Sequence, residues 1–295
     1  EAVALIMEAY IFSVLTDAYG DIPYVEALSG DDENYFPSYT PQEDIYLADA
    51  EGTPVSDGLL AKLRRANALL NEAPDDASVA GDILFGGELS MWQKFANSLR
   101  LRLLLHASKA YNNARQEMTS IVNNSGENPV FSNSSENATL DYLGSVPNVY
   151  PLRPPFGSGD FDAVVISDKL YSVLKERQDP RLTVYARPIA DTEPDSVTDR
   201  YDGQPVGYLP SNKPEGDAST LGYRYRNESG QPNSSGRAKG IFMTHAEVEF
   251  IRAEAAERGL ITGDADDHYK RGITSSMQYY NVNFSDKVVT KDIND

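Results

Sequence analysis

The chain has 295 residues, of which 40% are hydrophobic and 24% charged, so a disordered or fibrous protein is excluded. It carries 26 Lys and Arg against 45 Asp and Glu, and its formal charge of −19 repels nucleic acid and anionic lipid headgroups. It has no cysteine, which excludes disulfides, thiolate metal ligands and cysteine nucleophiles together. A neutral ligand, a cation or a basic protein surface remains compatible with this charge.

The first segment, residues 2–19, is apolar nearly throughout, and its apolar positions recur at helical spacing. Gly20 and Pro23 are expected to end the helix. A membrane span would place Glu8 and Asp17 in hydrocarbon, and neither a basic flank nor a cleavage site accompanies the segment. We therefore expect a core helix that is buried on all sides.

Three more helical segments are predicted before residue 122. Thr40 and Pro41 should begin one, with the hydroxyl as cap and the proline in the first turn. Residues 59–70 form a second, and the run 88–111, with Trp92 on its apolar face, is the longest periodic segment in the chain.

The middle of the chain, residues 123–240, is rich in Ser, Asn, Pro, Gly and Tyr. Residues 164–174 are its one predicted helix, and the rest is predicted to form long loops with short hairpins. Long loops within a compact protein usually carry function, so this region is where we expect ligand binding.

Helical periodicity returns at Thr244, which is followed three residues later by Glu247 in the pattern of a capping box. Gly259 should end this helix, and a second helix should begin at Asp264. Two helices with so short a connection run antiparallel, as in a tetratricopeptide hairpin. Small residues stand where the two helices would approach closely: Ala255, Gly272 and Ser276.

The predicted fold is therefore mostly α, a tetratricopeptide-like helix-hairpin scaffold with long irregular loops and little β. We expect one domain over residues 1–295, with residues 1–122 and 241–285 as scaffold and 123–240 as the loop-rich ligand-binding region.

Signatures of catalysis and of cofactors are absent from the sequence. The three histidines stand at no metal-binding spacing, and no Walker, dinucleotide or GxSxG motif occurs, so no cofactor and no metal site is expected. An acidic group in one loop could supply oxygen ligands to calcium, but its spacing is not that of an EF-hand, and a plain acidic loop is the preferred interpretation. The group comprises Asp191, Glu193, Asp195, Asp199 and Asp202.

Tyrosines are the most informative residues of the middle region. A tyrosine offers a flat apolar face and a hydroxyl, which suits stacking on a sugar ring, although packing within the loops would also explain the same residues. The candidate ligand-binding residues are Tyr150, Tyr201, Tyr208, Tyr223, Arg224 and Tyr225. We call the dense group Tyr208, Tyr223, Arg224 and Tyr225 the tyrosine platform.

Three blocks of sequence resemble the SusD/RagB-like family of Bacteroidetes outer-membrane lipoproteins, especially its second subgroup. They are YGDIPY at residues 19–24, WQKFANSLRLR at 92–102, and EVEFIRAEA at 247–255 followed by Gly263-Asp264-Ala265 and Tyr269. Their order and spacing also fit the family. The shared blocks are expected to be scaffold, because ligand residues in this family lie in variable loops.

The resemblance implies a lipid-anchored, surface-exposed protein that binds glycan or another nutrient over a SusC-like TonB-dependent transporter. It also implies a tetratricopeptide-like fold and no enzymatic activity. Family members usually carry an N-terminal lipidated cysteine and several hundred residues, so we expect this chain to be cut at both ends. The membrane would be reached only through that lipid anchor.

Three hypotheses for function follow from the sequence. The first is a non-catalytic protein that captures an oligosaccharide by aromatic stacking and hands it to a transporter. The second is a protein-interaction scaffold that binds no small ligand. The third is a glycosidase that uses two carboxylates, but none of the many possible pairs among the 45 acidic residues stands out.

Overall fold

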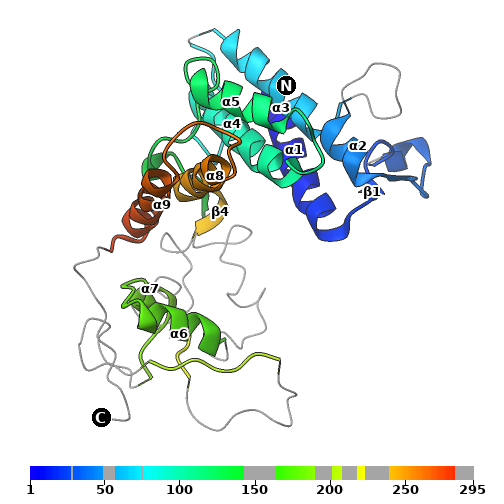
Figure 1. The fold of residues 1–295 in the computed structure, drawn as a ribbon. Helices are drawn as coiled ribbons and strands as arrows, with labels where there is room; N and C mark the ends of the chain where they lie inside the picture. Colours follow the sequence, from blue (N-terminus) through cyan, green and yellow to red (C-terminus); the bar gives the residue numbers. More distant parts are fainter. Residues whose placement is uncertain are drawn as a thin grey trace. The chain divides into compact units, whose positions relative to one another are not determined.

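A computed structural model describes residues 1–27, 29–48, 57–74, 76–142, 164–189, 201–207, 218–222 and 239–282 (Figure 1). The chain divides into two compact units. The first unit comprises Glu1–Ala138 and Met243–Ser275, and the second comprises Thr139–Phe242 and Ser276–Asp295. The boundary at residues 242 and 243 lies close to the predicted change of character near residue 240, whereas the boundary at residues 138 and 139 falls later than the predicted change near residue 123. The expectation of one domain over residues 1–295 stays a prediction.

The first unit is built from packed helices. The helix α1 packs against α3 and α4, and α4 in turn packs against α5 and α8 (Figure 1). The helices α4 and α8 therefore pack together although more than a hundred residues separate them in the sequence. The bounds are α1 Ala2–Tyr19, α2 Gln42–Leu47, α3 Leu59–Asn71, α4 Leu89–Ala107, α5 Ala114–Asn123 and α8 His245–Glu257, with short 3-10 turns η1 Ser29–Asp32 and η2 Ser134–Glu136. The last helix, α9 Ala265–Tyr280, belongs to this unit as far as Ser275.

The first helix, α1, differs from its prediction in burial. Ile6 and Ala9 are fully buried, but Ile11 and Val14 are each 50% exposed, so the expectation of burial on all sides is wrong. Nearly every face of the helix is apolar, and the sequence therefore cannot indicate which face packs inward. By length and composition α1 would also pass as a membrane span, yet it packs on α3 and α4 as a core helix does.

Most of the other helices lie where the sequence places them, with shifted ends. The predicted helix 88–111 ends at Ala107, and α5 was not predicted as a separate element. The predicted cap of α2 is wrong: Thr40 belongs to strand β2, Tyr39–Thr40, Pro41 occupies the N-cap, and no side chain caps the helix. Strand pairing takes precedence there over the local capping signal.

Four aromatic rings form the centre of the first unit. The ring of Phe95 lies 6.1 Å from that of Phe85, 6.2 Å from that of Trp92 and 6.2 Å from that of Phe131, with which it stacks. Phe95 and Phe131 are fully buried, and Trp92 is 4% exposed. Burial of these large rings is a main source of stability for the unit.

Asp82 organises the turn that precedes α4. One carboxylate oxygen accepts backbone hydrogen bonds from Leu84 at 2.8 Å and Phe85 at 3.2 Å. The other accepts from Gly87 at 3.0 Å and from the indole Nε1 of Trp92 at 2.8 Å. Burial alone would raise the pKa of Asp82, but these donors outweigh it and hold the pKa below its usual range.

Asp82→Ala is therefore expected to destabilise the first unit by about 1–3 kcal/mol, because it leaves a buried indole N–H and three backbone amides without their acceptor. Urea unfolding followed by circular dichroism measures the loss. The control is Asp76→Ala at an exposed position in the preceding loop. Equal losses in the two variants would contradict a special role for Asp82.

One of the two hydrogen bonds of the predicted capping box is present at the start of α8. The hydroxyl of Thr244 accepts from the backbone amide of Glu247 at 3.2 Å, and Gly259, at a φ of 67°, follows the helix end. The Glu247 side chain does not bond back to the cap. It instead accepts from Arg102 on α4, at 2.6 Å to Nε and 2.9 Å to a terminal nitrogen. A residue of the capping motif thus joins α8 to α4.

The helices α8 and α9 form the predicted antiparallel hairpin. Near the start of α8, His245 Nδ1 lies 2.9 Å from Ser275 Oγ in the second half of α9. Later in α8, the ring centre of Phe250 lies 5.7 Å from that of Tyr269, near the start of α9, so the two helices run in opposite directions. A Cβ at Gly272 would lie 2.8 Å from the Phe250 ring, so the absent side chain allows the close approach that the sequence predicted.

The second unit contains α6 Asp168–Glu176, α7 Leu182–Tyr185, and the paired strands β3 Ala138–Asp141 and β4 Lys239–Met243. The predicted helix 164–174 begins later, at Asp168, because the Ser167 hydroxyl caps it by accepting from the amide of Leu170. Strands β1 Ile22–Pro23 and β2 Tyr39–Thr40 also pair, antiparallel, in the first unit. The described residues are therefore mostly helical with little β, as predicted.

Candidate functional site

The predicted ligand-binding tyrosines are largely outside the described residues. These are Tyr150 and the whole tyrosine platform, Tyr208, Tyr223, Arg224 and Tyr225, so their role stays a prediction. Tyr201 is described, and it is only 2% exposed within an apolar cluster of the second unit formed with Ile166, Leu174, Leu182 and Ala186. Its role as a ligand-binding residue stays a prediction, and its burial favours the alternative that it packs within this region.

The candidate calcium loop also falls mostly outside the described residues. Only Asp202 is described, and its carboxylate accepts from the backbone amide of Gly203 at 2.9 Å. Among the described residues, no three Asp, Glu or His side chains gather closely enough to hold a metal ion.

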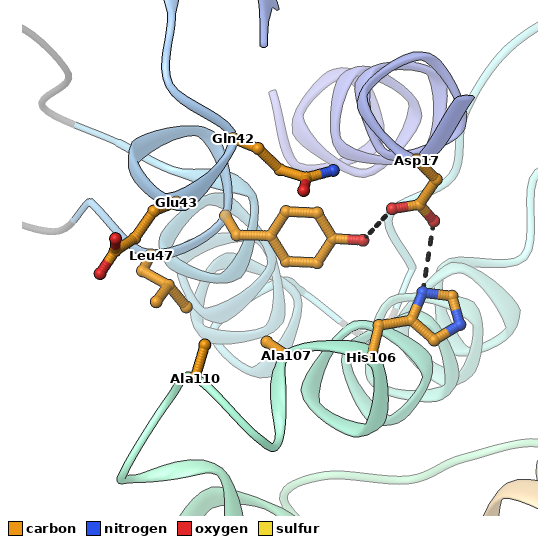
Figure 2. Close-up of a pocket in the computed structure, with 8 residues that line it drawn as sticks. Asp17, Gln42, Glu43, Leu47, His106, Ala107 and Ala110 are labelled. Carbon is orange, nitrogen blue, oxygen red and sulfur yellow. Dashed lines mark hydrogen bonds and ion pairs between the residues drawn. The ribbon is translucent and has the colours of Figure 1, made fainter. Parts of the chain in front are cut away.

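A pocket of about 270 Å³ opens in the first unit at the meeting of α1, α2 and α4 (Figure 2). Both polar and apolar side chains line it. The residues that line it are Asp17 from α1, Gln42, Glu43, Tyr46 and Leu47 from α2, His106 and Ala107 from α4, and Ala110 beyond it. We refer to it as the Asp17 pocket.

Asp17 links the three helices that form this pocket. One carboxylate oxygen accepts from the Tyr46 hydroxyl at 2.5 Å, and the other lies 3.2 Å from Nδ1 of His106 (Figure 2). Asp17 and His106 are partly exposed, with 38% and 47% of their side-chain surface accessible. Both therefore remain within reach of a ligand from solvent.

Tyr46 is the buried member of this group, at 6% exposure. Burial raises its pKa well above the usual range, and the hydrogen bond to Asp17 and the charge of Asp17 raise it further. The phenol therefore stays protonated at ordinary pH and donates its single proton to Asp17.

Backbone contacts hold α2 against the end of α1. The side-chain amide of Gln42 donates to the carbonyl oxygen of Thr16 at 2.8 Å, and the backbone amide of Gln42 donates to Asp21 at 2.9 Å. These two bonds fix the first turn of α2 beside Asp17. The pocket therefore exists only where α2 is packed against the end of α1.

Sequence reasoning did not identify the Asp17 pocket. It treated Asp17 only as an obstacle to a membrane span, and it found no metal-binding spacing at His106. The one available signal was a charged residue near the end of an otherwise apolar helix. Its partner Tyr46 lies 29 residues away in the sequence, so no motif spacing could have joined them.

The architecture defines the class of protein: a helical scaffold of the SusD-like type. A SusD homolog from Bacteroides fragilis is 28% identical, with a TM-score of 0.70 over 95% of this chain and 57% of its own. An outer-membrane protein from Bacteroides vulgatus, described as probably involved in nutrient binding, is 28% identical, with a TM-score of 0.77 over 95% of this chain and 59% of its own. A chitin-binding protein is 26% identical, with a TM-score of 0.72 over 96% of this chain and 57% of its own.

The SusD-like family described as starch-binding and associating with the outer membrane matches residues 1–293. The chain belongs to this family, which confirms the resemblance drawn from the three sequence blocks. It spans somewhat more than half the length of the solved structures that it matches. None of the curated proteins matches it.

Proposed function

We propose that this protein binds an oligosaccharide or related nutrient at the bacterial cell surface and delivers it to a SusC-like TonB-dependent transporter. In the full-length protein a lipid anchor would hold it to the outer membrane. The protein acts without catalysis. The observation that carries the proposal is membership, over residues 1–293, of a family described as starch-binding and associated with the outer membrane.

Two further observations support binding of a glycan. One of the similar solved structures is described as a chitin-binding protein and another as involved in nutrient binding. The chain also carries eight of its 18 tyrosines in its loop-rich middle, residues 123–240, and flat rings with hydroxyl rims suit sugar rings. We propose that the tyrosine platform stacks on the ligand.

The variants Tyr223→Ala and Tyr225→Ala are each expected to weaken glycan binding about tenfold or more, because truncating an aromatic anchor removes a large share of an interface's binding energy. Isothermal titration against a panel that includes starch and chitin oligosaccharides measures the change. The matched control is Tyr35→Ala, at a tyrosine of the first unit that is 70% exposed. Unchanged affinity in both platform variants would refute stacking at these residues.

The transporter is tested separately by co-purification of the tagged full-length protein from outer membranes. We expect a TonB-dependent barrel to be retained together with it. Recovery of the protein without any barrel would contradict the delivery role even where glycan binding holds.

A protein-interaction scaffold is the second candidate, and a specific observation favours it. Large apolar side chains are exposed on the first unit, among them Ile11 and Val14 on α1 and Phe36, which is 93% exposed, in the following segment. Where such side chains form one contiguous patch, they often mark a protein contact. Co-purification of a barrel with no binding across the glycan panel would favour this candidate.

A further inference from the structure

We propose that the Asp17 pocket is a separate binding site for a small ligand that carries a protonated amine. All of its lining residues belong to the first unit, and none belongs to the tyrosine platform. The inference therefore goes beyond the proposed function.

The hydrogen-bonding groups of the pocket point to a ligand that donates. The proton of Tyr46 is committed to Asp17, and the Gln42 amide donates to Thr16. The contact of His106 Nδ1 with Asp17 favours the tautomer that carries its proton on Nδ1 and leaves Nε2 as an acceptor. What remains for a ligand is mostly acceptor capacity, which an ammonium group with its three N–H donors satisfies.

The charge of the lining favours a cation in the same way. Two carboxylates, Asp17 and Glu43, line the pocket together with one imidazole, and no Lys or Arg is among the lining residues. Glu43 is exposed, and no ion pair of its side chain is found within the part of the chain that the structure describes. The nearby Arg102 is held by Glu247 in a two-pronged pair, and its positive charge also acts on Tyr46.

The size of the pocket limits the rest of the ligand. A cavity of about 270 Å³ lies near the lower end of ligand pockets, so it takes one sugar ring or a short alkyl chain and not an oligosaccharide. Leu47, Ala107 and Ala110 offer an apolar surface to the carbon skeleton. An amino sugar unit or a compact amine meets both conditions.

Glucosamine and glucose test the proposal, because they differ only in an ammonium group in place of a hydroxyl. Each sugar is titrated into the 295-residue chain at neutral pH, and binding is monitored by the NMR chemical shifts of the backbone amides. Glucosamine should bind about tenfold more tightly than glucose and should shift the amide signals of the lining residues. Glu43→Gln and Asp17→Asn should each weaken glucosamine binding about tenfold while leaving glucose unaffected.

Asp44→Asn is the matched control. It removes the same charge from the adjacent exposed position of α2, and Asp44 is not among the lining residues. We expect less than about a twofold change in this variant, because an exposed charge outside the pocket contributes little. Because Glu43 is exposed, its substitution should not disturb folding, so the test stands even if Asp17→Asn unfolds.

Three results would overturn the proposal: equal binding of glucose and glucosamine, no binding of glucosamine at millimolar concentration, or unchanged affinity in Glu43→Gln. The double variant Tyr223→Ala and Tyr225→Ala should leave glucosamine binding intact. Its loss in that variant alone would place the amine at the tyrosine platform instead. Failure of the pocket is thereby distinguished from failure of glycan binding.

Discussion

Glu249→Gln is expected to lower the free energy of unfolding of the first unit by about 2–4 kcal/mol, since it removes the buried carboxylate that two arginines and two histidines share. Glu249 is 3% exposed. Its carboxylate lies 2.7 Å from Nδ1 of His268 and 2.9 Å from Nε of Arg271. It also lies 3.4 Å from Arg252 and 3.5 Å from Nε2 of His245.

The substitution keeps the shape of the side chain but leaves these groups facing one another without a counter-charge. The Arg271 side chain is 52% exposed and can turn to solvent, whereas His268 and His245 are enclosed. For this reason we expect the loss to fall within the stated range and not above it.

The same carboxylate gives a pH dependence with a definite sign. Burial alone would raise the pKa of Glu249, but hydrogen bonds from His245, His268 and Arg271 and the charge of Arg252 outweigh it and lower the pKa far below 4.5. A depressed pKa means that the contribution is complete above pH 4.5 and is lost as the pH falls toward the folded pKa. The stability difference between wild type and Glu249→Gln should therefore narrow as the pH falls below 4.5.

Urea unfolding monitored by tryptophan fluorescence suits this measurement. The chain has one tryptophan, Trp92, which is 4% exposed in the first unit, so its emission reports on that unit. The control is Glu257→Gln at an exposed position of the same helix. Equal stability of Glu249→Gln and wild type, or a difference that widens in acid, would contradict the role assigned to Glu249.

Phe95→Ala is expected to cost about 3–5 kcal/mol, the range observed when a buried phenylalanine is truncated and leaves a cavity. Phe95 is fully buried on α4. In addition to its contacts with Phe85, Trp92 and Phe131, its ring centre lies 5.9 Å from that of Tyr10 on α1. Loss of this ring would loosen the packing of α1 on α4 as well as the aromatic centre. Phe95→Leu should lose less, because it keeps part of the volume.

Phe36→Ala provides the matched control, since the same atoms are removed from a side chain that is 93% exposed. We expect a change within about 0.5 kcal/mol there. Circular dichroism is the better probe for this pair, because Phe95 contacts Trp92 and its truncation would alter the fluorescence baseline. A Phe95→Ala loss no larger than that of Phe36→Ala would show that the aromatic centre is not a main source of stability.

The sequence determined the features that depend on neighbours within a few residues. Helical periodicity gave α3, α4 and the α8–α9 hairpin, and Gly259 and the Thr244 cap gave two of its boundaries. The absence of side-chain bulk at Gly272 indicated the close approach of the hairpin. The family could also be recognised, because its blocks are short stretches of scaffold with fixed order and spacing.

Only the tertiary structure decided which face of each element is buried and which distant side chains meet. It turned one apolar face of α1 outward, buried Tyr201, and paired Glu247 with Arg102 across 145 residues of sequence. It also brought Asp17, Tyr46 and His106 together in a pocket that no spacing predicts. The physical reason is that periodicity and capping are interactions within about one helical turn, whereas a pocket or a buried ion pair exists only after helices far apart in the chain have packed.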